Sequence, residues 1–236
     1  MHIDSGIDQQ LAMLQFSDSF FPGGATAFSW GLESLRLDVQ VSNAEQVFGL
    51  LQAQVSHRWA GLDRPLMQLA HQAFTACGDT PALLDVLCDL DRLCEAMSLT
   101  RGWREASRRL GFTQLRMHAD LGVACAQRYL ETVRGGHAPG HLPVVQGALW
   151  AAYRLPAGSC DAMAAGGLCT SIIGAALRMG MIGHVDGQRL LTRMRPVIAG
   201  VLSQPPPARE DMSSGTPALD IAAMRHEARS ARLFAN

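Results

Sequence analysis

Two adjacent glycines in the segment DSFFPGGATAFSWGLESL (18–35) are the first residues that could do chemistry. Glycine lets backbone amides approach an anion at the start of a helix, so this segment could hold a phosphate. The phosphate-binding patterns G-x-G-x-x-G and G-x-x-x-x-G-K-[ST] are missing from the chain, and all 20 basic residues are arginine. Without lysine, the chain can have neither a P-loop lysine nor a Schiff-base lysine. We therefore interpret the segment as a tight turn whose aromatic residues serve the core or a partner: Phe20, Phe21, Phe28 and Trp30.

Metal-binding side chains are present but poorly grouped. Among the eight histidines, the nearest pair is His137 and His141, which flanks the glycine and proline of RGGHAPGHLP (134–143) and predicts a solvated loop. The six cysteines occur singly, without a C-x-x-C motif, as is typical of buried thiols in the reducing cytosol. The sequence thus indicates no metal site, no permanently bound cofactor and a cytoplasmic location.

The sequence shows no recognisable arrangement for nucleophilic catalysis. There is no G-x-S-x-G elbow, and isolated carboxylates such as Glu33 and Glu105 are typical helix-pairing residues. Glu105 lies in RGWREASRRLG (101–111) among four arginines that favour an ion-pair network or a docking site: Arg101, Arg104, Arg108 and Arg109. With a formal charge of −1, no bulk field draws the protein to nucleic acid or to an anionic membrane.

Helical periodicity runs along almost the whole chain. Apolar residues recur at intervals of three and four within 44–59, 83–97 and 121–133, whereas no convincing period-2 strand occurs. Capping residues support these helices at Ser42 or Asn43 and at Thr80-Pro81, and we expect Gly183 to end a helix. The charge-free run 162–177 is shorter than the ~20 residues that span a bilayer, so it predicts a fully buried helix. We predict an all-α, single-domain bundle of about eight to ten helices with a linker-tethered C-terminal helix.

Three parts of the chain are expected from its composition. They are an all-helical domain (1–202), a Pro/Ser-rich flexible linker (203–215) and a C-terminal partner-binding helix or tail (216–236), in which Thr216 is the expected cap. One face of the tail helix carries Ile221, Met224, Ala228 and Ala231, and another carries Arg225, Arg229 and Arg232. This spacing leaves open whether the helix folds back on its own domain or becomes ordered only against a partner.

Three segments in chain order share one resemblance. They are LQFSDSFFPGGATAFSWGLESL (14–35), ALRMGMIGHVDGQRLL (176–191) and PALDIAAMRHEARSARLF (217–234). Together they resemble the urease accessory protein UreF family over about residues 11–234. The chain departs from the family's usual ending Arg-Leu-Phe-Arg-Ser, because Ala235 and Asn236 replace the last two residues.

The resemblance implies an all-helical, non-enzymatic accessory protein that forms a homodimer and binds UreD, called UreH in some organisms. This complex would recruit the GTPase UreG and activate the urease apoprotein, with nickel handled by the assembled complex and its insertion coupled to GTP hydrolysis. No catalytic or metal residue is expected in the chain itself. The residues expected to bind partners are Phe21, Pro22, Gly24, Ser29, Gly31, Glu33, Gly183, Gln188, Arg189, Asp220, Arg225, His226, Glu227, Arg232, Leu233 and Phe234.

Two alternative functions remain open, and simple experiments distinguish them from this one. An all-α enzyme with a site assembled from scattered His and Glu should turn over a substrate alone, and a nickel-binding metallochaperone should retain nickel after dialysis. We also predict that deletion of residues 216–236 leaves the domain folded but abolishes recruitment of UreD and UreG. The sequence leaves open the dimer geometry and whether hydrolysis by UreG is accelerated or restrained.

Overall fold

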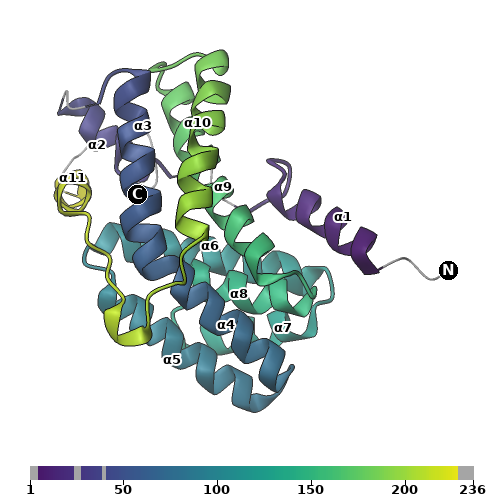
Figure 1. Ribbon diagram of the computed structural model, residues 1–236. Coiled ribbons are helices and arrows are strands. Elements are labelled where there is room, and N and C mark those ends of the chain that lie inside the picture. Colours follow the sequence, from purple (N-terminus) through teal and green to yellow (C-terminus); the bar gives the residue numbers. More distant parts are fainter. Residues whose placement is uncertain (1–4, 24–27, 39–40, 228–236) are drawn as a thin grey trace. The chain divides into compact units, whose positions relative to one another are not determined.

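The computed structural model describes residues 5–23, 28–38 and 41–227 and is all-α, as predicted, with no strand in these ranges (Figure 1). Helices α3, η2 and α4 follow one another without a break, so the described ranges hold ten continuous helical segments besides a 3-10 turn. The elements are α1 (Ser5–Ser17), α2 (Leu32–Leu37), α3 (Ala44–Ala53), the π-helix η2 (Gln54–Asp63), α4 (Arg64–Cys77), α5 (Pro81–Met97), α6 (Arg101–Asp120), α7 (Ala124–Arg134), α8 (Leu142–Ala152), α9 (Ala157–Arg178), α10 (His184–Leu202), the 3-10 helix η3 (Arg209–Asp211) and α11 (Pro217–Glu227).

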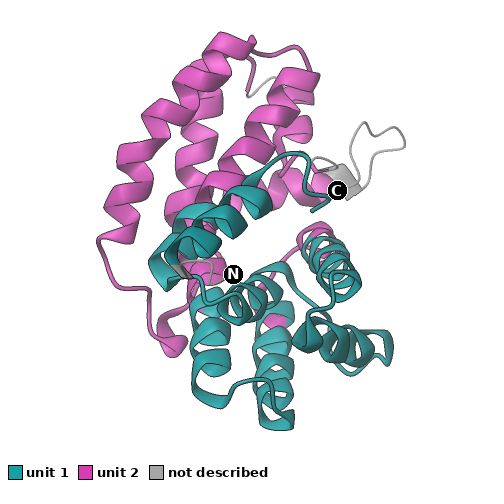
Figure 2. Ribbon diagram, turned by 90° about the vertical axis from the view of Figure 1, so that its right-hand side faces the viewer, with its two compact units in different colours: residues 1–24, 66–95, 107–163 teal, residues 25–65, 96–106, 164–236 magenta. Residues whose placement is uncertain are grey.

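The helices group into two compact units, which Figure 2 colours teal and magenta. Unit 1 comprises residues 1–24, 66–95 and 107–163, and unit 2 comprises residues 25–65, 96–106 and 164–236. Helices α4, α5, α6 and α9 each contribute residues to both units. The sequence-based division at residues 203 and 216 falls inside unit 2 and stays a prediction.

Several helix ends follow the expected capping chemistry. Asn43 caps α3, because its side chain accepts a hydrogen bond from the amide of Gln46. Pro81 is the first residue of α5, where its missing N–H costs no helical hydrogen bond. Local sequence therefore determines where these two helices begin.

Helix α9 ends three residues earlier than we expected from Gly183. Gly180 adopts a left-handed backbone with φ of 65°, and the amides of Gly180 and Met181 bond the carbonyls of Leu177 and Ala176. These two hydrogen bonds are the Schellman pattern that terminates a helix. The expectation for Gly183 is wrong, because Gly183 is the N-cap of α10.

The charge-free run 162–177 lies within α9. By length and composition this helix could cross a membrane, and 56% of its most apolar window is buried inside the protein. The core helix of a soluble protein passes the same test, so the observation is weak support for a membrane span. The predicted helix is present but only partly buried, since Gly167 and Thr170 are exposed.

Unit 1 contains a buried carboxylate that the sequence analysis did not single out. Asp91 of α5 accepts hydrogen bonds from the Tyr129 hydroxyl (2.5 Å) and from the backbone amides of Gly140 and His141 (both 2.7 Å). The His141 side chain is fully buried, and its Nε2 lies 2.8 Å from Glu95 Oε2. The prediction of a solvated loop is therefore wrong for His141, because Asp91 draws the loop before α8 into the core.

The C-terminal part of unit 2 packs along the π-helix. Arg64 donates hydrogen bonds to the carbonyls of Val201 and Gln204 at the end of α10, both at 3.0 Å. The Ser213 amide bonds the Gly61 carbonyl of η2 at 3.0 Å, and Ser214 Oγ bonds the Met97 carbonyl at 2.8 Å. The hydrogen bonds of Ser213 and Ser214 hold the segment between η3 and α11 in place, although its composition predicts a flexible linker.

Candidate partner-binding surface

The aromatic turn at the start of the chain exposes one ring fully. Phe20 is 94% exposed, whereas Phe21 is half-buried and Pro22 is exposed. In unit 1, the ring of Phe21 packs near Phe16 and His118, with centroids 5.3 and 5.4 Å away. The expected partner contacts at Phe21 and Pro22 thus lie on accessible residues, while Gly24 lies outside the described residues.

The second half of the same segment is core of unit 2. Phe28 and Trp30 are 1% and 8% exposed, and Trp30 Nε1 donates to Ser171 Oγ at 2.9 Å. Trp30 and Gly31 both have a left-handed backbone, with φ of 54° and 83°. Gly31 adopts this conformation without steric cost at the start of α2, which is a conformational reason for glycine at this position.

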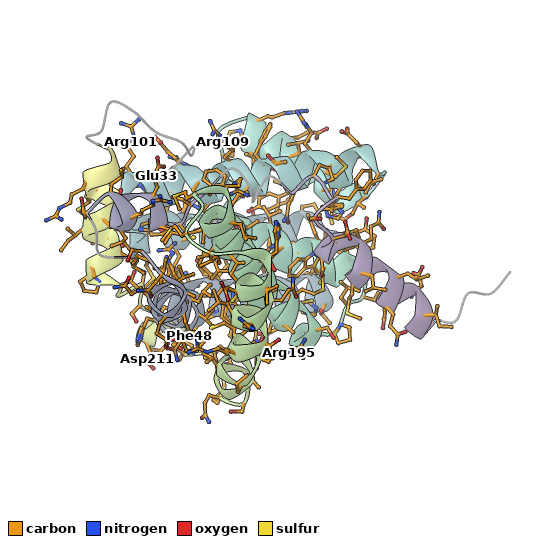
Figure 3. The ribbon with its side chains drawn as sticks, turned by 90° about the horizontal axis from the view of Figure 1, so that it is seen from above. Glu33, Phe48, Arg101, Arg109, Arg195 and Asp211 are labelled. Atoms are coloured by element: carbon orange, nitrogen blue, oxygen red, sulfur yellow. The ribbon has the colours of Figure 1, made fainter. Side chains whose placement is uncertain are left out.

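Ser29 before α2 and Glu33 within α2 were expected to contact a partner, but neither faces solvent. Ser29 is fully buried and Glu33 is 6% exposed. Figure 3 shows Glu33 on α2. The structure thus differs from the expectation that these two side chains face a partner, because both are buried within unit 2. Their role in partner binding stays a prediction that their burial does not support.

Helix α11 is held against unit 2 by a face that the apolar pattern did not indicate. Leu219, Ala222 and Ala223 are buried, and so is Asp220, whose Oδ1 accepts a hydrogen bond from Trp103 Nε1 at 3.1 Å. Burial raises the pKa of the Asp220 carboxyl, while the Arg58 charge and the Trp103 hydrogen bond lower it. Of the two possibilities that the spacing left open, this structure has the helix folded back on its own unit.

The opposite face of α11 is an exposed surface with apolar and charged residues. Ile221 and Met224 are 50% and 44% exposed, and Leu37 at the end of α2 is 54% exposed. Arg225 Nη1 lies 3.2 Å from Asp38 Oδ2, bridging α11 to the residue after α2. These two charged residues also line a pocket of about 200 Å³ together with Ala218, Ile221 and Ala222. We call Leu37, Ile221, Met224 and this pocket the α11 surface.

Three further expected residues lie at the start of α10. Gly183, Gln188 and Arg189 are all exposed, and Arg189 Nη1 lies 3.1 Å from Asp186 Oδ1. Among the remaining tail residues, His226 and Glu227 end α11, but their side chains are outside what the structure describes, as are Arg232, Leu233 and Phe234. Thr216 precedes α11 and is buried, and its hydroxyl has no hydrogen-bond partner among the described residues.

The arginine-rich start of α6 forms local contacts. Arg101 Nε lies 2.6 Å from Glu105 Oε1, and Arg104 donates to the carbonyls of Ser98 and Leu99. Figure 3 shows Arg101 at this end of the helix. Arg101 thus forms the predicted ion pair with Glu105, whereas Arg104 donates to backbone carbonyls of the loop before α6.

Within the described ranges, no group of three or more His, Cys, Asp and Glu side chains could hold a metal ion. Burial raises the pKa of the Cys125 thiol to about 11 and those of Cys160 and Cys169 to about 12. These three thiols are therefore protonated at neutral pH, a state that is weakly nucleophilic.

Two residues of the α11 contact escaped sequence reasoning. Arg58 is a buried arginine of η2, and Trp103 is a buried tryptophan between Gly102 and Arg104. A tryptophan within an arginine-rich helix was the available signal for Trp103. Arg58 lies three residues after Val55 and four before Leu62, which is the spacing of the buried face, but nothing in the sequence indicated what an arginine there contacts.

Comparisons with known proteins place the chain in one family. The sequence model of the family described as UreF matches residues 41–195. The chain is 31% identical over 241 residues to the urease accessory protein UreF of Trichodesmium erythraeum (strain IMS101), covering 99% of this chain and 100% of the relative. It is 30% identical over 232 residues to that of Corynebacterium glutamicum (strain R), covering 97% and 98%. It is 26% identical over 234 residues to that of Bacillus sp. (strain TB-90), covering 97% and 99%. With a family match over more than half of its length and relatives aligned end to end, the chain belongs to the UreF family.

Proposed function

We propose that the chain is a scaffold for urease maturation that binds UreD or UreH, recruits the GTPase UreG and acts on the urease apoprotein. In this proposal it works in the cytoplasm as a homodimer. It holds no nickel permanently, because the assembled complex handles the metal and couples GTP hydrolysis to nickel insertion. The proposal is supported by end-to-end similarity to proteins named urease accessory protein UreF, which are named as accessory proteins rather than enzymes.

The α11 surface is the observation that carries the proposal. Ile221 lines the pocket together with the Asp38–Arg225 pair, and the exposed residues Leu37 and Met224 are the chain neighbours of that pair. Apolar residues gathered around a pocket and bordered by charge are typical of a protein interface. We assign this surface to UreD, with UreG joining the resulting complex.

Substitutions on the outer face of α11 test this assignment. Ile221→Ser together with Met224→Ser removes apolar area from the surface but leaves Asp220 and the buried residues of the helix in place. We expect co-purification of UreD and UreG to be lost and activation of urease in cells to fail. Leu121→Ser is the matched control, because Leu121 is an exposed apolar residue of unit 1 with 51% exposure.

Intact complexes and full urease activation by the double variant would contradict the assignment. Point variants are the sharper test here, because deletion of residues 216–236 would also uncover the buried ring of Trp103. The remaining parts of the proposal have their own measurements. We expect sedimentation equilibrium to give a dimer, and equilibrium dialysis against NiCl₂ followed by buffer to leave less than one nickel ion per chain.

A further inference from the structure

Arg58 is an unusual residue in unit 2. Its side chain is buried, with 3% residue exposure, and its Nε and Nη1 atoms have no hydrogen-bond partner among the described residues. Its Nη2 lies 3.7 Å from Asp63 Oδ1, a contact longer than a hydrogen bond. A guanidinium removed from water without full hydrogen bonding is costly unless other negative charge or a π-system compensates it.

The face of Trp103 supplies part of that compensation. The guanidinium carbon of Arg58 lies 5.0 Å from the centroid of the Trp103 ring, within the range of a cation–π interaction. Trp30 stacks on Trp103 with centroids 5.7 Å apart and an interplanar angle of 23°. The indole of Trp103 therefore contacts both an aromatic ring and a buried cation, and its N–H donates to Asp220.

Asp220 places a carboxylate next to this arrangement. It is 5% exposed and is the only acidic residue of α11 whose side chain the structure describes. The positive charge of Arg58 acts on the Asp220 carboxyl, and the Trp103 N–H bonds it directly. Arg58, Trp103 and Asp220 thus couple η2, α6 and α11, because Trp103 contacts both charged residues and the Arg58 charge acts on Asp220.

We infer that Arg58 and Trp103 are positioning residues that hold the C-terminal helix on unit 2 through the negative charge of Asp220. The inference rests on the proposed function only for the role of the α11 surface, because this contact fixes the helix that carries Ile221 and Met224. In contrast, the Arg225–Asp38 pair is exposed, with Arg225 58% accessible, and exposed pairs contribute little to stability.

Hydrogen exchange of the full chain, without partners, tests the inference. Asp220→Asn retains an oxygen that can accept from Trp103 but removes the charge that faces Arg58. We expect exchange in residues 217–227 to accelerate about tenfold or more, because the buried Arg58 loses one of the two carboxylates near it and keeps only Asp63. Peptides from α7 in unit 1 should keep their protection. Arg225→Gln is the matched control on the same helix and should change exchange by less than about threefold.

A double variant separates charge coupling from mere packing. Arg58→Met with Asp220→Asn removes both charges, and we expect it to recover part of the protection that Asp220→Asn alone loses. Burial raises the pKa of the Asp63 carboxyl and the Arg58 charge lowers it, so Asp63 takes up a proton more readily in this variant. If Asp220→Asn unfolds unit 2 altogether, recovery of folding in the double variant supports the inference.

Two results would overturn the inference. One is unchanged exchange in Asp220→Asn, and the other is a double variant no better protected or folded than Asp220→Asn. The readout needs no UreD or UreG, so failure of the proposed function is distinguishable. A chain with a protected tail that does not recruit partners would count against the function and leave the positioning role intact.

Discussion

Replacement of Asp91 by Asn tests the buried hydrogen-bond centre of unit 1. Asp91 is fully buried and accepts from Tyr129, Gly140 and His141 at 2.5 to 2.7 Å. An asparagine retains one acceptor oxygen and replaces the other by an NH₂ donor, which must then face a donor. At least one hydrogen bond is lost, which costs about 1 kcal/mol, and the opposed donor adds about 1 to 2 kcal/mol. We expect Asp91→Asn to lower the free energy of unfolding by about 2 to 3 kcal/mol at low pH, where the Asp91 carboxyl is protonated and the loss is largest.

The pH dependence of this loss follows from the carboxyl's environment. Burial raises the pKa of Asp91 from 3.8 to about 6, against the hydrogen bonds from Tyr129 and the two amides. Because the folded state binds the proton more tightly, this group's stabilisation is fully present below pH 3.8 and is lost as pH rises through about 6. The change over this window is about 3 kcal/mol. The difference in stability between the wild type and Asp91→Asn should therefore shrink as pH rises from 4 to 7.

Urea unfolding followed by circular dichroism at several pH values measures both effects. Asp85→Asn is the control, because Asp85 is exposed on the same helix and should change stability by less than about 0.5 kcal/mol. The reasoning would be refuted by an Asp91→Asn midpoint equal to that of the wild type throughout, or by a difference that grows with pH.

Two further predictions concern a close backbone approach and a buried histidine. In Gly61→Ala the added methyl meets the Ser213 carbonyl, so the segment before α11 must move. We expect faster tryptic cleavage at the exposed Arg209 and a free energy of unfolding lower by about 1 to 3 kcal/mol. The control Gly49→Ala has open space around it and should be neutral or slightly stabilising. Burial lowers the pKa of His118 from 6.5 to about 4, so its stabilisation is present above pH 6.5 and is lost as pH falls toward 4. His118→Phe should abolish that acid-side loss of about 3 kcal/mol in urea titrations, and an unchanged slope between pH 4 and 6.5 would contradict it.

The helices were predictable because their signals are local. Spacing of three and four, the Asn43 cap and Pro81 each act within one turn of helix, and the structure places a helix at each of the three predicted stripes, although Leu121 of the third lies in the turn before α7. Burial of polar residues was not predictable, because it depends on partners distant in sequence. Asp91 and His141 are 50 positions apart, yet their hydrogen bond decides that the loop before α8 is buried.

The candidate surface was predictable in part, for the same reason. The tail resemblance indicated Asp220 and Arg225 as partner-binding residues, and the structure separates them. Asp220 lies on the inner face of α11 against Trp103, whereas Arg225 lies on the outer face beside the pocket. Arg58 shares the spacing of three and four of the other buried residues of η2, but spacing does not show that Trp103 and Asp220, far along the chain, face it.

Helix α11 shows why an apolar stripe does not by itself identify a buried face. Ile221 and Met224 are the large apolar residues of the pattern, yet both are about half exposed, while small Ala222 and Ala223 and charged Asp220 are buried. The small alanine side chains let α11 approach the rest of unit 2 closely, and the Trp103 hydrogen bond offsets the cost of burying the Asp220 carboxylate. The helix thus does not use its most apolar residues to hold itself in place. Burial of Ile221 and Met224 by a partner would therefore contribute free energy to binding and not to folding. For this reason their substitution should affect assembly more than folding.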